Sequence, residues 1–264
     1  RTSPGRPSIR HPTVISQFGV LALGLWWQLA SPSRRAYATV QETLRRAAEP
    51  GARHYNVKAV VQRPLLGKKE ITADLYVDGT DRFALRHPPI PLLGEVWIGR
   101  NERESWIVPT HGPILVGDAT MLQRWIAENA DETDFATPYL HVTTILKRTS
   151  RHYDLQRLPD AVLAERDQPG TAVRCHRVHG VLRDATSERP RTIDLWVDRD
   201  TGIARRLVLD WKLQPGQFGR SKVTIELAGP VELPPNWFEP SAHHAEGRPV
   251  SRASFRSHSI HRIS

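Results

Sequence analysis

Apolar and polar residues alternate along much of the chain, and this period of two predicts strands with one buried face. The clearest case is residues 70–78, where the apolar positions are Ile71, Ala73, Leu75 and Val77. Other stretches with strand character are residues 82–86, 95–99, 104–108, 112–117, 171–183, 191–197, 203–212 and 222–228. Most are separated by short turns, which is typical of antiparallel hairpins. We therefore expect an antiparallel sheet.

Three segments have helical spacing instead. Residues 37–49 place Val40 and Leu44 on one face and are ended by Pro50-Gly51. Asp118 can cap a helix that runs through Asn129, with a buried stripe of Met121, Leu122, Trp125 and Ile126. Pro138 is expected to begin another helix, through about Lys147. Helices set to one side of an antiparallel sheet give an α+β, mainly β, fold.

Three further segments are expected outside the regular structure. Residues 87–91 contain three prolines, which cannot donate to a strand ladder, so a surface crossing is predicted there. Residues 159–170 read as a polar loop. Residues 240–264 are rich in Ser, His and Arg and almost without apolar side chains, which predicts a disordered basic tail.

The segment that precedes the sheet is apolar and uncharged. No Asp, Glu, Lys or Arg occurs from Pro12 to Ser33, and residues 13–30 are nearly long enough to span a bilayer as a helix. Residues 1–36 are therefore expected to be a membrane anchor or signal segment, followed by a β-rich domain at residues 37–239. Cleavage after Ala38 is the alternative to a retained anchor, because residues 36–38 have the A-x-A pattern of a signal-peptidase site.

Charge and motifs limit the function classes. The net charge is +9, but the basic residues are scattered and no nucleic-acid-binding module accompanies them, so we do not expect nucleic acid as a partner. The single cysteine, Cys175, excludes an intramolecular disulfide. On a strand, His176 points away from Cys175 and His179, so no metal site is expected. No cofactor or catalytic motif occurs, and we expect a protein that is not an enzyme.

Several hairpin motifs resemble the lipoprotein-carrier fold of bacterial envelopes, the LolA, LolB and RseB group. They are the turn at residues 79–83, the strand pair with Trp97 and Trp106, and the hairpin at residues 195–207. The resemblance implies a curved antiparallel half-barrel with helices on its concave side. It also implies a partner such as a lipid or lipoprotein acyl chain, or an envelope or sigma-factor regulatory protein. Unlike a lipidated member, the chain has no cysteine just after the apolar segment.

The tryptophans are the candidate ligand-lining residues, because aromatic side chains cover apolar area with few rotamers. The candidates are Trp97, Trp106, Trp196 and Trp211. We expect an extracytoplasmic binding or regulatory module that holds an acyl chain or a lipoprotein segment in an apolar groove. Two alternatives remain: an envelope hydrolase that uses His and Asp from loops, and a protein-interaction domain without a small ligand.

Overall fold

The computed structural model describes residues 31–63, 67–90, 92–118, 121–122, 142–164, 172–184, 189–213 and 217–252. Within these ranges lie the helices α2 (Pro32–Ala48) and α5 (Val142–His152), and a short 3-10 helix, η2 (Pro240–His243), lies near the end of the described part. The first group of strands comprises β1 (Arg53–Arg63), β2 (Gly67–Asp78), β3 (Arg82–Ile90), β4 (Gly94–Arg100), β5 (Ser105–Pro109) and β6 (Ile114–Gly117). The second group comprises β7 (Tyr153–Ala164), β8 (Ala172–Leu182), β9 (Thr192–Asp198), β10 (Ala204–Asp210), β11 (Gly219–Pro230) and β12 (Val250–Arg252).

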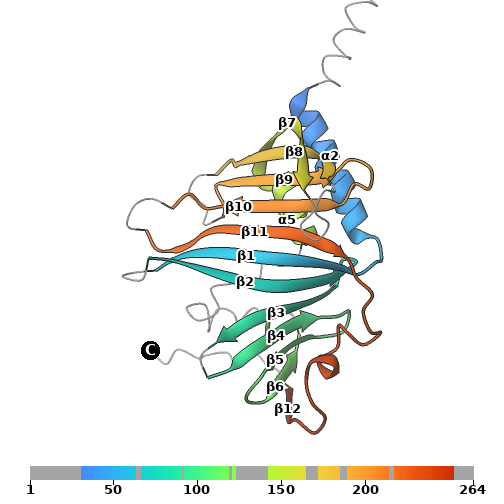
Figure 1. Ribbon diagram of the computed structural model, residues 1–264, viewed down its shortest axis with the longest axis vertical. Helices are drawn as coiled ribbons and strands as arrows, with labels where there is room; N and C mark the ends of the chain where they lie inside the picture. Colours follow the sequence, from blue (N-terminus) through green and yellow to red (C-terminus); the bar gives the residue numbers. More distant parts are fainter. Residues whose placement is uncertain are drawn as a thin grey trace, which may run out of the picture.

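All the described strands belong to one open, curved sheet of 12 strands, in the order β12-β6-β5-β4-β3-β2-β1-β11-β10-β9-β8-β7 (Figure 1). Two meanders build it, because β1 to β6 pair in chain order and so do β7 to β11. The meanders meet where β1 pairs with β11, with Val57 opposite Ile225. All neighbours are antiparallel except β12, which pairs with β6 in parallel. The expected mainly β fold with an antiparallel sheet is confirmed.

The sheet has an apolar inner face and a largely polar outer face. We call the face against which α2 and α5 pack the inner face, because their buried residues, such as Val40 and Ile145, share one cluster with the apolar strand residues. Strand alternation places Val57, Leu75 and Leu209 in that cluster and their neighbours on the outer face. The helices pack mainly on β7 and β8, at one end of the sheet (Figure 1). The apolar cluster extends much further, to β4 and β5.

Several element boundaries differ from the sequence prediction. Helix α2 begins five residues early, at Pro32, because the Ser31 side chain accepts a hydrogen bond from the backbone N–H of Arg34 at 3.3 Å. Helix α5 continues to His152. Strand β1 was not predicted, and residues 159–164 belong to strand β7 rather than to a loop. The exposed outer half of β7 lacks the apolar alternation on which the prediction relied.

The prediction of a surface crossing at residues 87–91 was wrong over residues 87–90. These residues continue β3 beside β4, with a register irregularity between His87 and Ile90. Pro88 and Pro89 are tolerated because β3 has no ladder partner on its other side there among the described residues.

Some sequence predictions fall on residues that the structure does not describe. The predicted apolar segment at residues 13–30 and the helix residues 123–129 lie outside the described residues. Within the described part of the chain, no helix is long and apolar enough to span a bilayer. In the stretch expected to be a disordered tail, the structure contains η2 and β12, whereas residues 253–264 lie outside the described part.

Candidate functional site

The inner face is the largest apolar surface of the described domain. It carries one continuous cluster that runs from Leu155 on β7 through Leu75 on β2 to Ile107 on β5. Leu75 and Leu209 are 0% exposed and Val57 is 1% exposed, so this face is closed to water in the structure. Such a face can hold an apolar ligand only if packed side chains make room for it.

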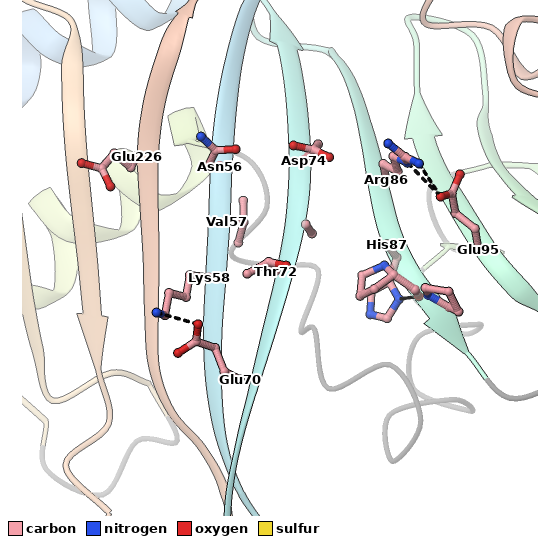
Figure 2. A pocket seen from close by; sticks show the side chains of 13 residues that line it. Asn56, Val57, Lys58, Glu70, Thr72, Asp74, Arg86, His87, Glu95 and Glu226 are labelled. Atoms are coloured by element: carbon pink, nitrogen blue, oxygen red, sulfur yellow. Dashed lines mark hydrogen bonds and ion pairs between the residues drawn. The ribbon is translucent and has the colours of Figure 1, made fainter. Parts of the chain in front are cut away.

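A cavity of about 650 Å³ lies where β2 and β3 separate (Figure 2). Its polar walls are Lys58 from β1, Glu70, Thr72 and Asp74 from β2, Arg86 from β3, and Glu95 from β4. The sheet opens here because the β2–β3 ladder ends at the pair Asp74 and Arg86, whereas β2 stays paired with β1 back to Gly67. Beyond Arg86, Pro88 and Pro89 have no N–H to donate, so β3 cannot continue the ladder.

Ion pairs span the walls of this cavity. Lys58 Nζ lies 2.6 Å from Glu70 Oε1, and Arg86 Nη2 lies 2.7 Å from Glu95 Oε2. Beside the cavity, His54 Nε2 lies 3.0 Å from Asp74 Oδ1, which is an ion pair only when the ring is protonated. The hydrogen bond to Glu95 raises the pKa of Arg86. These side chains are a quarter to a half exposed, so the pairs shape the cavity more than they stabilise the fold.

An aromatic cluster covers the outer face on β2, β4 and β5. We define it as Tyr76, Trp97, Trp106, Trp237 and His243. The imidazole of His243 stacks on Trp97 at 4.1 Å and on Trp106 at 5.0 Å between ring centroids, and its Nε2–H donates to the Trp237 carbonyl at 2.7 Å. Burial lowers the pKa of His243, which favours the neutral ring. The cluster therefore fastens the segment after β11 to the sheet.

The structure brings together only two of the four tryptophans that the sequence singled out. Trp97 and Trp106 both belong to the aromatic cluster on the outer face. Trp196 lies elsewhere on that face, with the guanidinium carbons of Arg177 and Arg206 5.1 and 5.9 Å from its ring centroid. Trp211 packs at the edge of the inner cluster. Ligand contact by any of the four stays a prediction.

The His and Asp residues of β7 to β9 form separate pairs. His176 Nδ1 lies 3.1 Å from Asp160 Oδ1, and His179 Nδ1 lies 3.1 Å from Asp194 Oδ1. Burial raises the pKa of Cys175 to about 11, which keeps its thiol protonated. In the described ranges, no group of three His, Cys, Asp or Glu side chains is arranged to hold a metal ion.

Sequence reasoning missed the split between β2 and β3 and the role of His243. The proline pair at residues 88–89 was the local signal for the split. The position of His243 depends on contacts between distant parts of the chain, for which no local signal exists.

Comparison with known proteins gives structural likeness only. No protein-family model matches the chain, and no curated protein sequence matches it. Among solved structures it is similar to lipoprotein LppX from Mycobacterium tuberculosis, with 11% identity, a TM-score of 0.42, and coverage of 76% of this chain and 99% of that one. A LolA superfamily protein from Nitrosomonas europaea has 10% identity, a TM-score of 0.39, and coverage of 78% and 98%.

The protein MucB matches with 15% identity and a TM-score of 0.38, over 86% of this chain and 69% of MucB. The matched structures thus include a member of the LolA superfamily, the group that the hairpin motifs resemble. At TM-scores below 0.5 these likenesses say nothing about a ligand or partner of this chain.

Proposed function

We propose that this protein is a non-catalytic binding module of the bacterial cell envelope, which holds a lipid acyl chain or a lipoprotein segment against the inner face. The observation that carries the proposal is the length of the inner apolar cluster, which extends across the sheet far beyond the strands that α2 and α5 contact most. Each methylene buried against such a surface contributes about 0.8 kcal/mol, so a long acyl chain gains enough to offset its ordering.

The proposed location follows from the leader. Residues 13–30 would hold the protein at a membrane, with residues 37–239 outside the cytoplasm. If cleavage occurs after Ala38, the same domain would be free in the periplasm. An envelope or sigma-factor regulatory protein is then a candidate binding partner.

One observation favours a second candidate, a protein-interaction domain without a small ligand. The inner face is almost completely buried, with Leu75, Leu85 and Leu209 all at 0% exposure. An interior that is already filled needs no ligand.

Native mass spectrometry of the purified domain separates the two candidates. A lipid carrier is expected to retain lipid through purification, or to take it up from vesicles of bacterial phospholipid. Absence of lipid in repeated preparations exposed to such vesicles would contradict the carrier and support the interaction domain.

A pair of variants locates any bound lipid. Ala59, on the inner face, and Ala84, in the outer apolar cluster, are both 0% exposed. Ala59→Leu is expected to lower lipid retention severalfold, and Ala84→Leu is expected to leave it unchanged, with circular dichroism confirming that both variants fold. Equal retention by both would place the lipid away from the inner face.

A further inference from the structure

The edge of β2 that faces β3 is open over residues 67–73 among the described residues. These residues pair with β1 along one side, but on the other side the ladder to β3 begins only at Asp74. Figure 2 shows β2 and β3 moving apart below Asp74 and Arg86, with the cavity between them. Backbone N–H and C=O groups along an open edge form a template for another strand.

The neighbouring part of β3 cannot fill this edge. Pro88 and Pro89 lack N–H groups, and residues 87–90 keep β4 as their partner. Natural edges are often protected by charged residues, and Lys68 and Lys69 do this at the start of β2. Ile71, Thr72 and Ala73, next to the cavity, are uncharged.

The two faces of the open edge differ in polarity. Ile71 and Ala73 belong to the inner apolar cluster, so an added strand would place apolar side chains beside them. Glu70, Thr72 and Asp74 face the cavity, so the alternate side chains of an added strand would lie beside carboxylates.

The charge of the cavity is opposite to that of the whole chain. Its lining contains the four carboxylates Glu70, Asp74, Glu95 and Glu226 and the two cations Lys58 and Arg86, whereas the chain has a formal net charge of +9. Glu70 pairs with Lys58, Glu95 with Arg86 and Glu226 with Arg206. Among the described residues Asp74, whose partner is His54, is therefore the lining carboxylate that is not paired with Lys or Arg. Opposite charge gives specificity for a partner segment, and it adds to backbone pairing at the open edge.

We propose that an extended segment of a partner protein, with apolar and basic residues in alternation, binds by adding a strand to β2 at residues 67–73. Its apolar side chains lie toward Ile71 and Ala73, and its Arg or Lys side chains lie toward Glu70 and Asp74. The cavity opens on the outer face, and the added strand would reach the inner face only beside Ile71 and Ala73. Binding of such a segment does not require lipid at the inner face.

Synthetic peptides test the proposal on the full domain. The probe is the acetylated, amidated heptapeptide TVRVKVT, with TVEVEVT as its acidic counterpart, and binding is measured by isothermal titration calorimetry. The basic peptide is expected to bind at least tenfold more tightly than the acidic one. Equal binding of the two would overturn the charge assignment and with it the proposed partner.

Backbone methylation separates strand addition from simple charge attraction. Alternate residues of a strand turn their N–H groups to opposite edges, so methylation of the three valine nitrogens blocks one edge, and methylation of the arginine and lysine nitrogens blocks the other. Strand addition predicts that one of the two methylated peptides loses at least tenfold in affinity and the other binds nearly as the parent. If both bind as the parent does, strand addition is refuted.

Protein variants and hydrogen exchange locate the site. The double variant Glu70→Gln, Asp74→Asn is expected to weaken the basic peptide at least tenfold, whereas the control Glu102→Gln, whose side chain is 64% exposed and away from this cavity, is expected to leave it unchanged. Amides of residues 68–73 that face the open edge are expected to exchange fast in the free domain and at least tenfold more slowly with peptide. Full protection of these amides in the free domain would overturn the proposal, because the chain itself would then cover the edge.

Discussion

Gly99 leaves the space that Trp106 fills, so replacing this glycine with alanine is a direct test of the outer aromatic cluster. A Cβ atom at residue 99 would lie 2.0, 2.4 and 2.5 Å from Cζ2, Cε2 and Cη2 of Trp106. All three distances are far below van der Waals contact. The indole is 0% exposed, and its Nε1–H donates to the Phe238 carbonyl at 3.0 Å.

The magnitude follows from the two ways in which the clash can be relieved. If the strands move apart to admit the methyl group, overpacking costs about 1–3 kcal/mol. If the indole leaves its site, the loss approaches the 3–5 kcal/mol typical of removing a buried tryptophan, and the hydrogen bond to Phe238 is lost as well. We expect Gly99→Ala to lower the free energy of unfolding by about 3 kcal/mol.

A double-mutant cycle with urea unfolding followed by far-UV circular dichroism checks this reasoning. In the Trp106→Ala background the clash is absent, so Gly99→Ala is expected to cost less than about 1 kcal/mol, the ordinary range for a strand substitution. The coupling between the two sites is then about 2 kcal/mol or more. An equal cost of Gly99→Ala in both backgrounds would refute the packing described here.

Three further predictions concern ionisable side chains. Burial acts to raise the pKa of Asp198, but hydrogen bonds from Arg205 and from backbone N–H groups outweigh it and hold the pKa below 3.8. The ionised carboxylate therefore stabilises the fold above about pH 3.8, and this stabilisation is lost as pH falls further. Asp198→Asn is expected to cost about 2 kcal/mol at pH 7 and to flatten the acid limb of stability against pH, measured by urea unfolding. Burial lowers the pKa of His243 below 6.5, so the contribution of its packing to stability is present above pH 6.5 and lost as pH falls further. Hydrogen exchange of residues 231–243, corrected for intrinsic rates, is therefore expected to accelerate as pH is lowered from about 7.5 to about 5. The variant His243→Phe is expected to show no such acceleration. The pKa of Cys175 is raised from 9.0 to about 11, which implies a thiolate fraction about 100-fold below that of a free thiol. Ellman's reagent is therefore expected to label this buried cysteine only when the protein unfolds. Rapid labelling of the folded protein would contradict its burial.

Local alternation was sufficient to predict most of the sheet from the sequence. It identified β2, the β9–β10 hairpin and β11, where apolar side chains such as Ile193 and Val223 recur at every second residue and lie on one buried face. The prediction missed β1, although its buried residues Tyr55, Val57, Ala59 and Val61 do alternate. It also missed β7, where the residues from Leu158 onward are partly or fully exposed. Alternation reports burial of one face, and it is silent where a strand is held by backbone pairing alone.

The candidate sites were less predictable because both depend on pairing between distant segments. The proline pair at residues 88–89 indicated correctly that a ladder must end, but the sequence does not reveal that β3 stays with β4 and leaves β2. The sequence predicted Trp97 and Trp106 as a cross-strand pair, but Trp97 lies opposite Val108 and Trp106 lies opposite Gly99. Their contact with His243 arises only when the segment after β11 crosses the outer face.

The pairing of β1 with β11 has a consequence for how the protein is made. Arg53 pairs with Pro230, so the central seam of the sheet joins the first strand of the domain to one of its last. Contacts this distant in sequence slow folding, and a nascent chain cannot form them until β11 has emerged from the ribosome. Until then β1 leaves the border of the first meander unpaired, so the sheet is completed only after β11 has been synthesised.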